Sequence, residues 1–369
     1  MVVEDTNIQN NMEEKKNIWG LNRPLRIIDC PWHLAHQWDM MSTLPDVQWF
    51  WLAQHRRPYS EGPRGDFYEK FDLTDIPYYE EGKYDLAILH MDQQCFANPL
   101  WKRGKGSVYR EFNETIKGIP KIVIMHGTPY FPETFSCDIQ EENYTELGYT
   151  KEQVGMSSVL IEKCKEEIGD NVMVVNSHRA VEQWGHGTAI IHGMDPNNWL
   201  DLPKEPRVVT MISPGGLDKY YDRTFLAAIK DALAERDITH CHITVDAQFK
   251  NFEDYRDFLG HSLIYINPTK ESPMPRARTE AMLSGCCVLT TPHQDADGFI
   301  QDGVNGFLIP RNPHKVADLV EELLNDYDRA VEVGQAGRAM ALGKFSMKNY
   351  ESQWTELITK TLKDYADKK

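Results

Sequence analysis

Short runs of apolar and β-branched residues alternate with helix-like patterns along most of this chain of 369 residues. This alternation is typical of βα units, in which parallel strands form a sheet that helices cover. The predicted strands fall into two series, 25–29, 47–52, 85–89, 121–125, 171–175 and 188–191, then 207–212, 242–245, 262–266, 287–290 and 306–309. The pattern therefore predicts an α/β fold.

Two series of strands predict two domains. A chain of 369 residues exceeds the size at which a single hydrophobic core usually stops growing. The segment 195–207 contains three prolines and several charges, so it predicts a linker. We expect a disordered lead-in over 1–20, an N-terminal domain over 21–200, a C-terminal domain over 201–345 and a closing helix over 346–369.

Charge and cysteine content exclude several classes of protein. The net charge of −16 repels phosphate backbones and anionic lipid surfaces, which argues against broad nucleic-acid or membrane binding. The seven cysteines are odd in number and lack zinc-ligand spacing, which argues against a disulfide framework or a structural zinc. No apolar stretch is long enough to span a membrane, and the polar N-terminus lacks the core of a signal peptide. We therefore expect a cytoplasmic protein.

The segments that follow the predicted strands are the candidates for a site, because ligands of open α/β sheets bind at the carboxyl ends of strands. Five segments in the second half of the chain also carry motifs in a consistent order. They are 191–199, which ends Asp-Pro-Asn-Asn-Trp, 267–285, which runs from a strand through a proline-containing loop into a helix, 290–293, 299–308 and the pair 345–346.

Together these motifs resemble the retaining GT-B glycosyltransferases of the Glu-x7-Glu type (glycosyltransferase group 1, family 4-like). The resemblance covers about residues 172–350 and, before them, only Met-His-Gly-Thr at 125–128. It implies two Rossmann-like domains that face each other across a cleft, with the last helix crossing back to the first domain. It also implies that the second domain binds a nucleotide sugar.

The resemblance implies a donor pyrophosphate held by basic side chains and by amides at a helix N-terminus. Gly215 and Gly216 follow a predicted strand and allow the backbone to approach the ligand closely. Lys219 and Arg223 lie near the start of the next helix and are the candidates for the basic pair. The alternative for both is a solvated charge at an exposed helix start.

Glu280 fits the second glutamate of the motif, which in the family accepts hydrogen bonds from the donor ribose hydroxyls. The first glutamate is irregular, because eight residues separate Glu271 from Glu280 and Ser272 stands at the family spacing. Glu271 reaches the sugar if the loop bulges, and Ser272 takes its place if the loop does not. Arg276 and Arg278 either approach the phosphates or pair with acids. The prolines of the loop leave three backbone N–H donors, those of Ser272, Met274 and Arg276.

In the first domain His126 follows a predicted strand, in a His-Gly pair that faces the cleft in relatives. The resemblance implies that it binds the transferred sugar or the leaving phosphate, and a locally satisfied loop histidine is the alternative.

The segment 31–39 takes the place of the family's glycine-rich first loop and supplies the acceptor-side candidates Trp32, His33 and His36. Three interpretations remain open for it. His33, His36 and Asp39 share a helix face and a metal could be drawn between them, Trp32 or Trp38 could stack on a sugar, or the segment packs as a core helix.

The implied function is transfer of a sugar from a nucleotide-sugar donor to an acceptor hydroxyl, with retention of configuration and without a metal or other cofactor. The leaving phosphate would take the proton of the acceptor. The expected partners are the donor and a glycan, protein or small-molecule acceptor. The alternatives are a non-catalytic nucleotide-sugar-binding protein, a sugar-nucleotide epimerase of the same architecture, and a transferase acting on a modified nucleobase in DNA, which the acidic charge disfavours.

Overall fold

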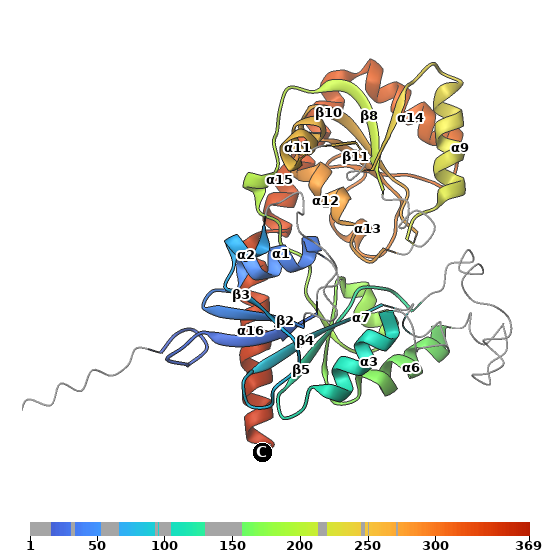
Figure 1. The fold of residues 1–369 in the computed structure, drawn as a ribbon. Helices are drawn as coiled ribbons and strands as arrows, with labels where there is room; N and C mark the ends of the chain where they lie inside the picture. Colours follow the sequence, from blue (N-terminus) through green and yellow to red (C-terminus); the bar gives the residue numbers. More distant parts are fainter. Residues whose placement is uncertain are drawn as a thin grey trace, which may run out of the picture.

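The structure is a computed structural model that describes residues 16–30, 34–52, 66–92, 95, 105–129, 157–212, 220–244, 248–249, 251–270 and 272–369. These residues form two domains, and in Figure 1 the second domain lies above the first.

The first domain contains a parallel sheet with the strand order β3-β2-β1-β4-β5-β6-β7. Its strands are β1 (Leu25–Asp29), β2 (Val47–Leu52), β3 (Leu73–Ile76), β4 (Leu86–Met91), β5 (Lys121–Met125), β6 (Val172–Val175) and β7 (Thr188–Ala189). The order reverses direction between β1 and β4, and such a switch point is where ligands of doubly wound folds bind. The edge strand β3 was not predicted, because its residues, Leu-Thr-Asp-Ile, lack a clear apolar pattern.

The second domain contains a parallel sheet with the order β12-β11-β10-β8-β9, which places its switch point between β8 and β10. Its strands are β8 (Glu205–Met211), β9 (His240–Ile243), β10 (Ser262–Asn267), β11 (Cys287–Thr290) and β12 (Phe307–Leu308). The predicted α/β fold with two Rossmann-like domains is confirmed.

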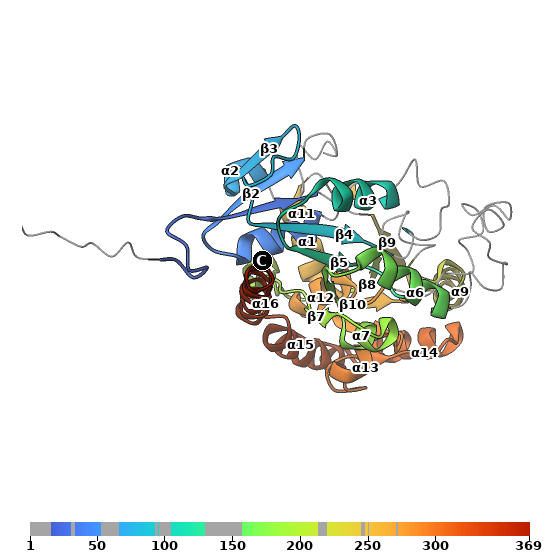
Figure 2. The ribbon, with the colours of Figure 1, turned by 90° about the horizontal axis from the view of Figure 1, so that it is seen from below.

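Helices cover both faces of the first sheet (Figure 2). On one face lie α3 (Lys105–Thr115), α6 (Ser157–Ile168) and α7 (His178–Trp184), and on the other α1 (Leu34–Thr43), α2 (Phe67–Lys70) and the closing helix α16 (Met347–Asp367). In β5 the side chains of Val123 and Met125 join the first core, whereas Ile122 and Ile124 join the second. Both faces are buried, which explains why the strands are apolar throughout.

The second sheet is covered in the same way. Helices α9 (Arg223–Ala234) and α14 (Pro313–Asn325) pack on one face, and α11 (Phe252–His261) and α12 (Arg276–Leu283) on the other. Helix α15 (Tyr327–Lys344) packs against α12 and β11, and the short α13 (Ala296–Phe299) follows β11.

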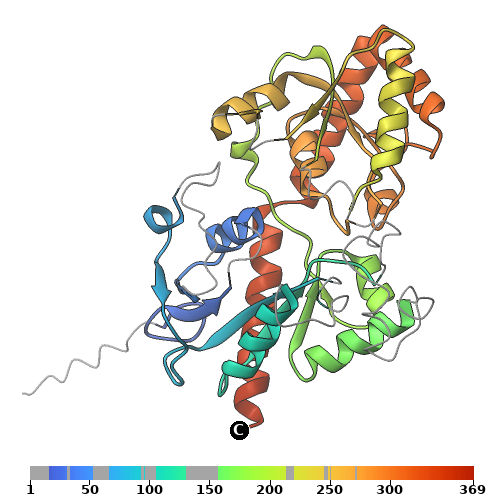
Figure 3. The ribbon, with the colours of Figure 1, turned by 45° about the vertical axis from the view of Figure 1, so that its right-hand side comes forward.

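The chain crosses between the domains twice, and the two crossings lie side by side (Figure 3). Ile190 is buried in the first domain, whereas Ile191 is buried in the second. On the return, Phe345 belongs to the second core and Tyr350, on α16, to the first. The N–H of Met194 donates to the Phe345 carbonyl at 2.9 Å, so the outgoing and returning segments are joined. The last helix therefore crosses back to the first domain, as the fold class implies.

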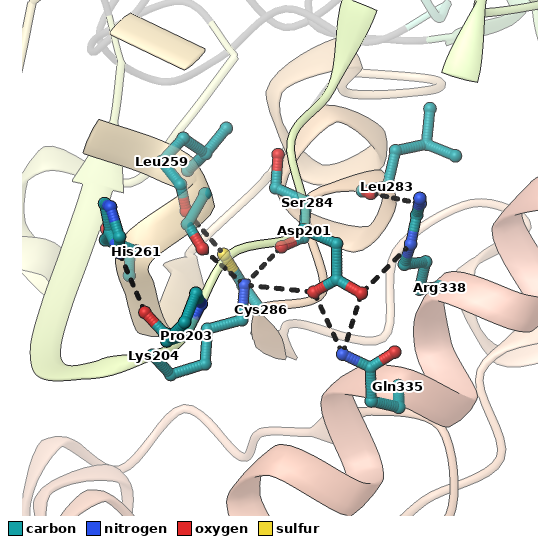
Figure 4. Close-up of polar contacts among 12 residues, drawn as sticks. Asp201, Pro203, Lys204, Leu259, His261, Leu283, Ser284, Cys286, Gln335 and Arg338 are labelled. Carbon is teal, nitrogen blue, oxygen red and sulfur yellow. Dashed lines mark hydrogen bonds and ion pairs between the residues drawn. The ribbon is translucent and has the colours of Figure 1, made fainter. Parts of the chain in front are cut away.

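A buried lysine, Lys204, joins the segment that precedes β8 to the rest of the second domain through hydrogen bonds (Figure 4). The side chain of Lys204 is 2 % exposed, and its ammonium donates to the carbonyl of Gly260 at 2.6 Å and to that of Ser284. These carbonyls lie at the C-terminal ends of α11 and α12, where a cation is favourable. Asp201 lies 3.6 Å from the same ammonium and also accepts from Gln335 at 2.9 Å, which ties the segment to α15.

We expect Lys204→Met to lower the free energy of unfolding by about 3 kcal/mol, because it removes a buried cation that serves two helix ends. Thermal unfolding measures the loss. Lys360→Met is the matched control, since Lys360 pairs with Asp364 on an exposed face of α16 and should leave the midpoint unchanged. Equal midpoints for the two variants would contradict the assigned role of Lys204.

Candidate functional site

The two switch points face each other at the domain interface, where described contacts join the first domain to the second. Asp92, directly after β4, accepts from the hydroxyl of Tyr220 at 3.4 Å. Asp39 of α1 forms an ion pair with Arg276, the first residue of α12, at 2.5 Å. The residues that follow β1, β4, β8 and β10 are therefore the centre of the candidate site.

On the first-domain side, three side chains form a line of hydrogen bonds. Asp29 ends β1, His90 lies in β4 and His126 follows β5. His90 Nε2 lies 2.9 Å from Asp29 Oδ1, and His90 Nδ1 lies 2.9 Å from His126 Nε2. Asp29 and His90 are buried, whereas His126 is partly exposed. The line therefore runs from the protein interior to its surface.

Both oxygens of the Asp29 carboxylate accept hydrogen bonds. Its Oδ1 also accepts from the N–H of Cys30 at 2.7 Å, and its Oδ2 accepts from the amide of Gln37 at 2.7 Å. The same Gln37 amide donates to the Cys30 carbonyl at 3.0 Å, which holds its orientation. A buried carboxylate with three donors is stabilised without a basic partner.

Helices α1 and α16 complete this side of the site. The ring of His36 meets that of His126 edge to face, with centroids 5.3 Å apart, and its Nε2 lies 3.5 Å from the hydroxyl of Tyr350. Burial raises the pKa of Tyr350, and the nearby carboxylate of Asp39 raises it further, so this phenol stays protonated. Trp38 packs against Phe67 and Phe71 in the core, the last of the three interpretations for this segment.

On the second-domain side, helix α12 begins at Arg276 after Pro275, which provides no side-chain cap. The side chain of Arg278, in the first turn, is 0 % exposed, and among the described residues no hydrogen-bond partner exists for its Nε and Nη1. Its guanidinium lies over the ring of Phe299, 5.0 Å from the centroid, and another of its nitrogens meets the sulfur of Met274 at 3.1 Å. Burial lowers the pKa of Arg278 to about 10, so it remains cationic at neutral pH.

Among the described residues no carboxylate forms an ion pair with Arg278, although the charge of Asp295 raises its pKa. Burial, together with the charges of Arg278 and Arg179, lowers the pKa of His293 to about 4, so this imidazole is neutral. A buried cation without a paired anion is costly, so an anionic ligand at this point would gain a partner that is already in place.

The other residues predicted to bind the nucleotide-sugar donor differ in burial and in partners. Glu280, 6 % exposed, accepts from the hydroxyl of Tyr255 at 2.9 Å. Met274 is buried and Ser272 is partly buried in the loop before α12. Arg223 is exposed at the start of α9. The side chain of Arg276 pairs with an acid, although that acid belongs to the other domain.

A small pocket lies beside this loop. It has a volume of about 180 Å³ and is lined by Thr269, Lys270, Thr291, Pro292, His293, Ile309, Pro310 and Arg311. Sites for drug-sized ligands measure roughly 300–1,000 Å³, so this pocket alone is too small for a nucleotide sugar.

A second set of contacts joins the domains at helix α7. The carboxylate of Asp295 accepts from the N–H of His178 at 2.7 Å and from that of Arg179 at 3.0 Å. The neighbouring Gln294 accepts from the hydroxyl of Ser177 at 3.0 Å, although its own φ of 53° is unusual for a residue other than glycine. The second domain therefore caps a helix of the first.

Several predictions lie outside the described residues, namely those for Trp32, His33, Gly215, Gly216, Lys219 and Glu271. Within the described ranges, no three His, Cys, Asp or Glu side chains come together as metal ligands. No helix in this described part is long and apolar enough to cross a membrane.

Sequence reasoning did not single out Asp29, Gln37 and Tyr255, and it included His90 and Asp295 only within the segments that follow predicted strands. The signal for His90 was its position at the end of a strand, but Asp29 stood inside an apolar run and resembled a core position.

Residues 222–326, from the cap of α9 to the end of α14, match the family model for glycosyl transferases group 1. A search of curated protein sequences finds no significant match.

Solved structures of glycosyltransferase type share the fold. HepE from Anabaena, in complex with UDP-glucose, has a TM-score of 0.58 and 13 % identity over 91 % of this chain and 100 % of its own. Sucrose-phosphate synthase from Thermosynechococcus elongatus has a TM-score of 0.57 and 13 % identity over 91 % of this chain and 98 % of its own. TarM, known from S. aureus, has a TM-score of 0.51 and 18 % identity over 73 % of this chain, which spans only 54 % of TarM.

At these identities the structural matches describe the fold, which is GT-B. The family model adds that the second domain carries a group 1 glycosyltransferase segment. The expectation that this chain is a glycosyltransferase is confirmed at the level of the enzyme class.

We expect Asp295→Ala to destabilise the protein by about 1–2 kcal/mol, because two amides at the start of α7 lose their acceptor. Thermal unfolding is the measurement. Asp295→Asn retains one acceptor oxygen, so its unfolding temperature should lie between that of Asp295→Ala and that of the unchanged protein. If the alanine variant unfolds at the original temperature, the domains do not meet at α7 in solution.

Proposed function

We propose that this protein transfers a sugar from a nucleoside-diphosphate donor to an acceptor hydroxyl, with the donor bound between the domains. One observation carries the proposal, the buried guanidinium of Arg278 in the first turn of α12, two of whose nitrogens have no hydrogen-bond partner among the described residues. A pyrophosphate is a ligand that such a site would favour, because it carries charge that grows as the glycosidic bond breaks.

Two further features support a donor phosphate at this point. The N-terminal amides of α12 have no side-chain cap, and helix N-termini favour anions. Arg276 stands at the same helix end, and its ion pair with Asp39 could open when a phosphate offers a stronger partner. Glu280, already held by Tyr255, is placed one helical turn further on, where a carboxylate can accept from ribose hydroxyls.

The resemblance of the motifs supports two finer features of the reaction. We infer retention of configuration, with the leaving phosphate taking the acceptor proton, and neutralisation by basic side chains and helix amides in place of a divalent metal. UDP-glucose is the first donor to test, because the HepE structure contains it. The acceptor would approach from the first-domain side, near His126 and His36.

The test is turnover of UDP-glucose with and without a panel of glycan, peptide and small-molecule acceptors. We expect release of UDP that increases with a suitable acceptor and persists in excess EDTA. Binding of UDP in a thermal-shift assay without any turnover would favour a binding protein. Reversible conversion of the donor without an acceptor would favour an epimerase, and activity on modified DNA would assign the nucleobase acceptor. Activity lost in EDTA and restored by Mn²⁺ would overturn the metal-independent mechanism.

We expect Arg278→Met to have opposite effects on stability and on binding. Removal of an uncompensated buried charge should raise the free energy of unfolding by about 1–4 kcal/mol. The same change should weaken UDP binding by about 1.5–3 kcal/mol, because a charge-assisted hydrogen bond is lost. Thermal unfolding and isothermal calorimetry measure the two effects.

Arg338→Met is the matched control for this variant. Arg338 donates to the Leu283 carbonyl at 2.6 Å and lies 3.4 Å from Asp201, so it is paired and lies at the other end of α12. Its loss should lower stability and leave UDP affinity unchanged. A destabilised Arg278→Met variant with normal UDP affinity would make Arg278 a structural residue.

A further inference from the structure

The carboxylate of Asp295 caps a helix other than its own. Asp295 is the N-cap residue of α13, where an aspartate usually accepts from amides of the helix that it precedes, but its side chain makes no such bond. Its two oxygens accept instead from the N–H groups of His178 at 2.7 Å and Arg179 at 3.0 Å, in the first turn of α7. Asp295 is therefore a buried anion of the second domain that the first domain holds.

The same short helix also contacts Arg278. The guanidinium lies over the ring of Phe299, the last residue of α13, 5.0 Å from the centroid. The charge of Asp295 raises the pKa of Arg278, yet the guanidinium nitrogens Nε and Nη1 have no hydrogen-bond partner within the described ranges. The carboxylate thus has two possible partners, the amides of α7 and the guanidinium, and it bonds the amides.

Further contacts fix this segment of the second domain against α7. Gln294 accepts from the hydroxyl of Ser177 at 3.0 Å and donates to Gln183 at 2.8 Å. Arg179 pairs with Asp297 at 2.7 Å. The backbone of Gln294 has a φ of 53°, in the left-handed region, and such a conformation persists where its surroundings hold it. The position of the carboxylate therefore depends on the contacts with α7.

We propose that the first domain sets the affinity of Arg278 for an anion without contacting that anion, because the first turn of α7 holds the Asp295 carboxylate away from the guanidinium. When this contact is lost, the carboxylate pairs with Arg278, and the buried ion pair competes with the ligand. The inference deepens the proposed function and rests on it for the identity of the ligand, a nucleoside diphosphate. The contacts of Asp295 themselves depend on no ligand.

A proline at position 178 removes one of the two N–H donors, puts a ring carbon in its place and keeps the helix. His178 is the first residue of α7, where proline is tolerated, and Ser177 before it has the extended backbone that proline requires, with φ −150° and ψ 157°. His178→Ala is the reference, since it removes the same exposed side chain and keeps the N–H. The difference between the two variants therefore reports the hydrogen bond to Asp295.

The first test needs no ligand and compares the effect of Arg278→Met in the two backgrounds by thermal unfolding. In His178→Ala the guanidinium has no paired anion, so Arg278→Met should raise the unfolding midpoint. In His178→Pro the released carboxylate pairs with Arg278, so the same substitution should lower the midpoint. An equal shift in both backgrounds would overturn the proposal, whether or not the protein binds nucleotides.

The second test is calorimetry with UDP. We expect His178→Pro to bind UDP more weakly than His178→Ala by a factor on the order of 10, a usual size for coupling between two sites. Asp295→Ala breaks the same contact with α7 but leaves no carboxylate to pair with Arg278, so it should not share this loss. The double variant of His178→Pro and Asp295→Ala should regain the affinity.

The outcomes of the calorimetry separate competition from a merely structural role. Equal losses of UDP affinity in His178→Pro and Asp295→Ala would mean that the contact only joins the domains, and would refute competition for Arg278. If the unchanged protein does not bind UDP, the proposed function fails, and the unfolding comparison still decides whether α7 keeps Asp295 from Arg278.

Discussion

The pairing of the two chain crossings is the constraint on which the site depends. Met194 of the outgoing segment donates to Phe345 of the returning one, and neighbouring residues on each segment are buried in different domains. Gly193 is essential to this packing, since a Cβ at that position would lie 2.6 Å from Cβ of Tyr350. Because the domains are joined by two adjacent segments, the carboxyl ends of both sheets stay opposite each other.

The two sides of the interface differ in how their buried charge is compensated. On the first-domain side, the carboxylate of Asp29 has three donors from within its own domain. On the second-domain side, the described direct contacts of the Arg278 guanidinium are a thioether and an aromatic ring, and Asp295 acts on it without an ion pair. A complete network resists change, whereas an incomplete one gains from a ligand, and this agrees with the proposal that the donor is held mainly by the second domain.

This contrast also explains how an acidic protein could hold the anionic donor proposed for it. The net charge of −16 acts at long range and is screened by salt, whereas Arg278 acts within a buried, low-dielectric region. Two first-domain carboxylates at the interface, Asp39 and Asp92, already have partners from the second domain in Arg276 and Tyr220. Local arrangement, not net charge, therefore decides what the interface binds.

The sequence by itself determined the two series of βα units, the approximate positions of most strands and the resemblance of the second half to group 1 glycosyltransferases. These are local properties, since strand patterns repeat every two residues and motifs are contiguous, so neighbouring residues contain the information. It also made His126, Arg276 and Glu280 candidates, through the resemblance of the motifs that contain them.

Only the tertiary structure decided which side chains meet. Asp29 and His90 are 61 residues apart, and His90 and His126 are 36 apart, so no local pattern links them. The order β3-β2-β1-β4-β5 places β4 between β1 and β5, and this pairing brings the three residues into line. Arg276 meets Asp39 because the chain crosses back between the domains, and this contact between distant segments exists only once both sheets have formed.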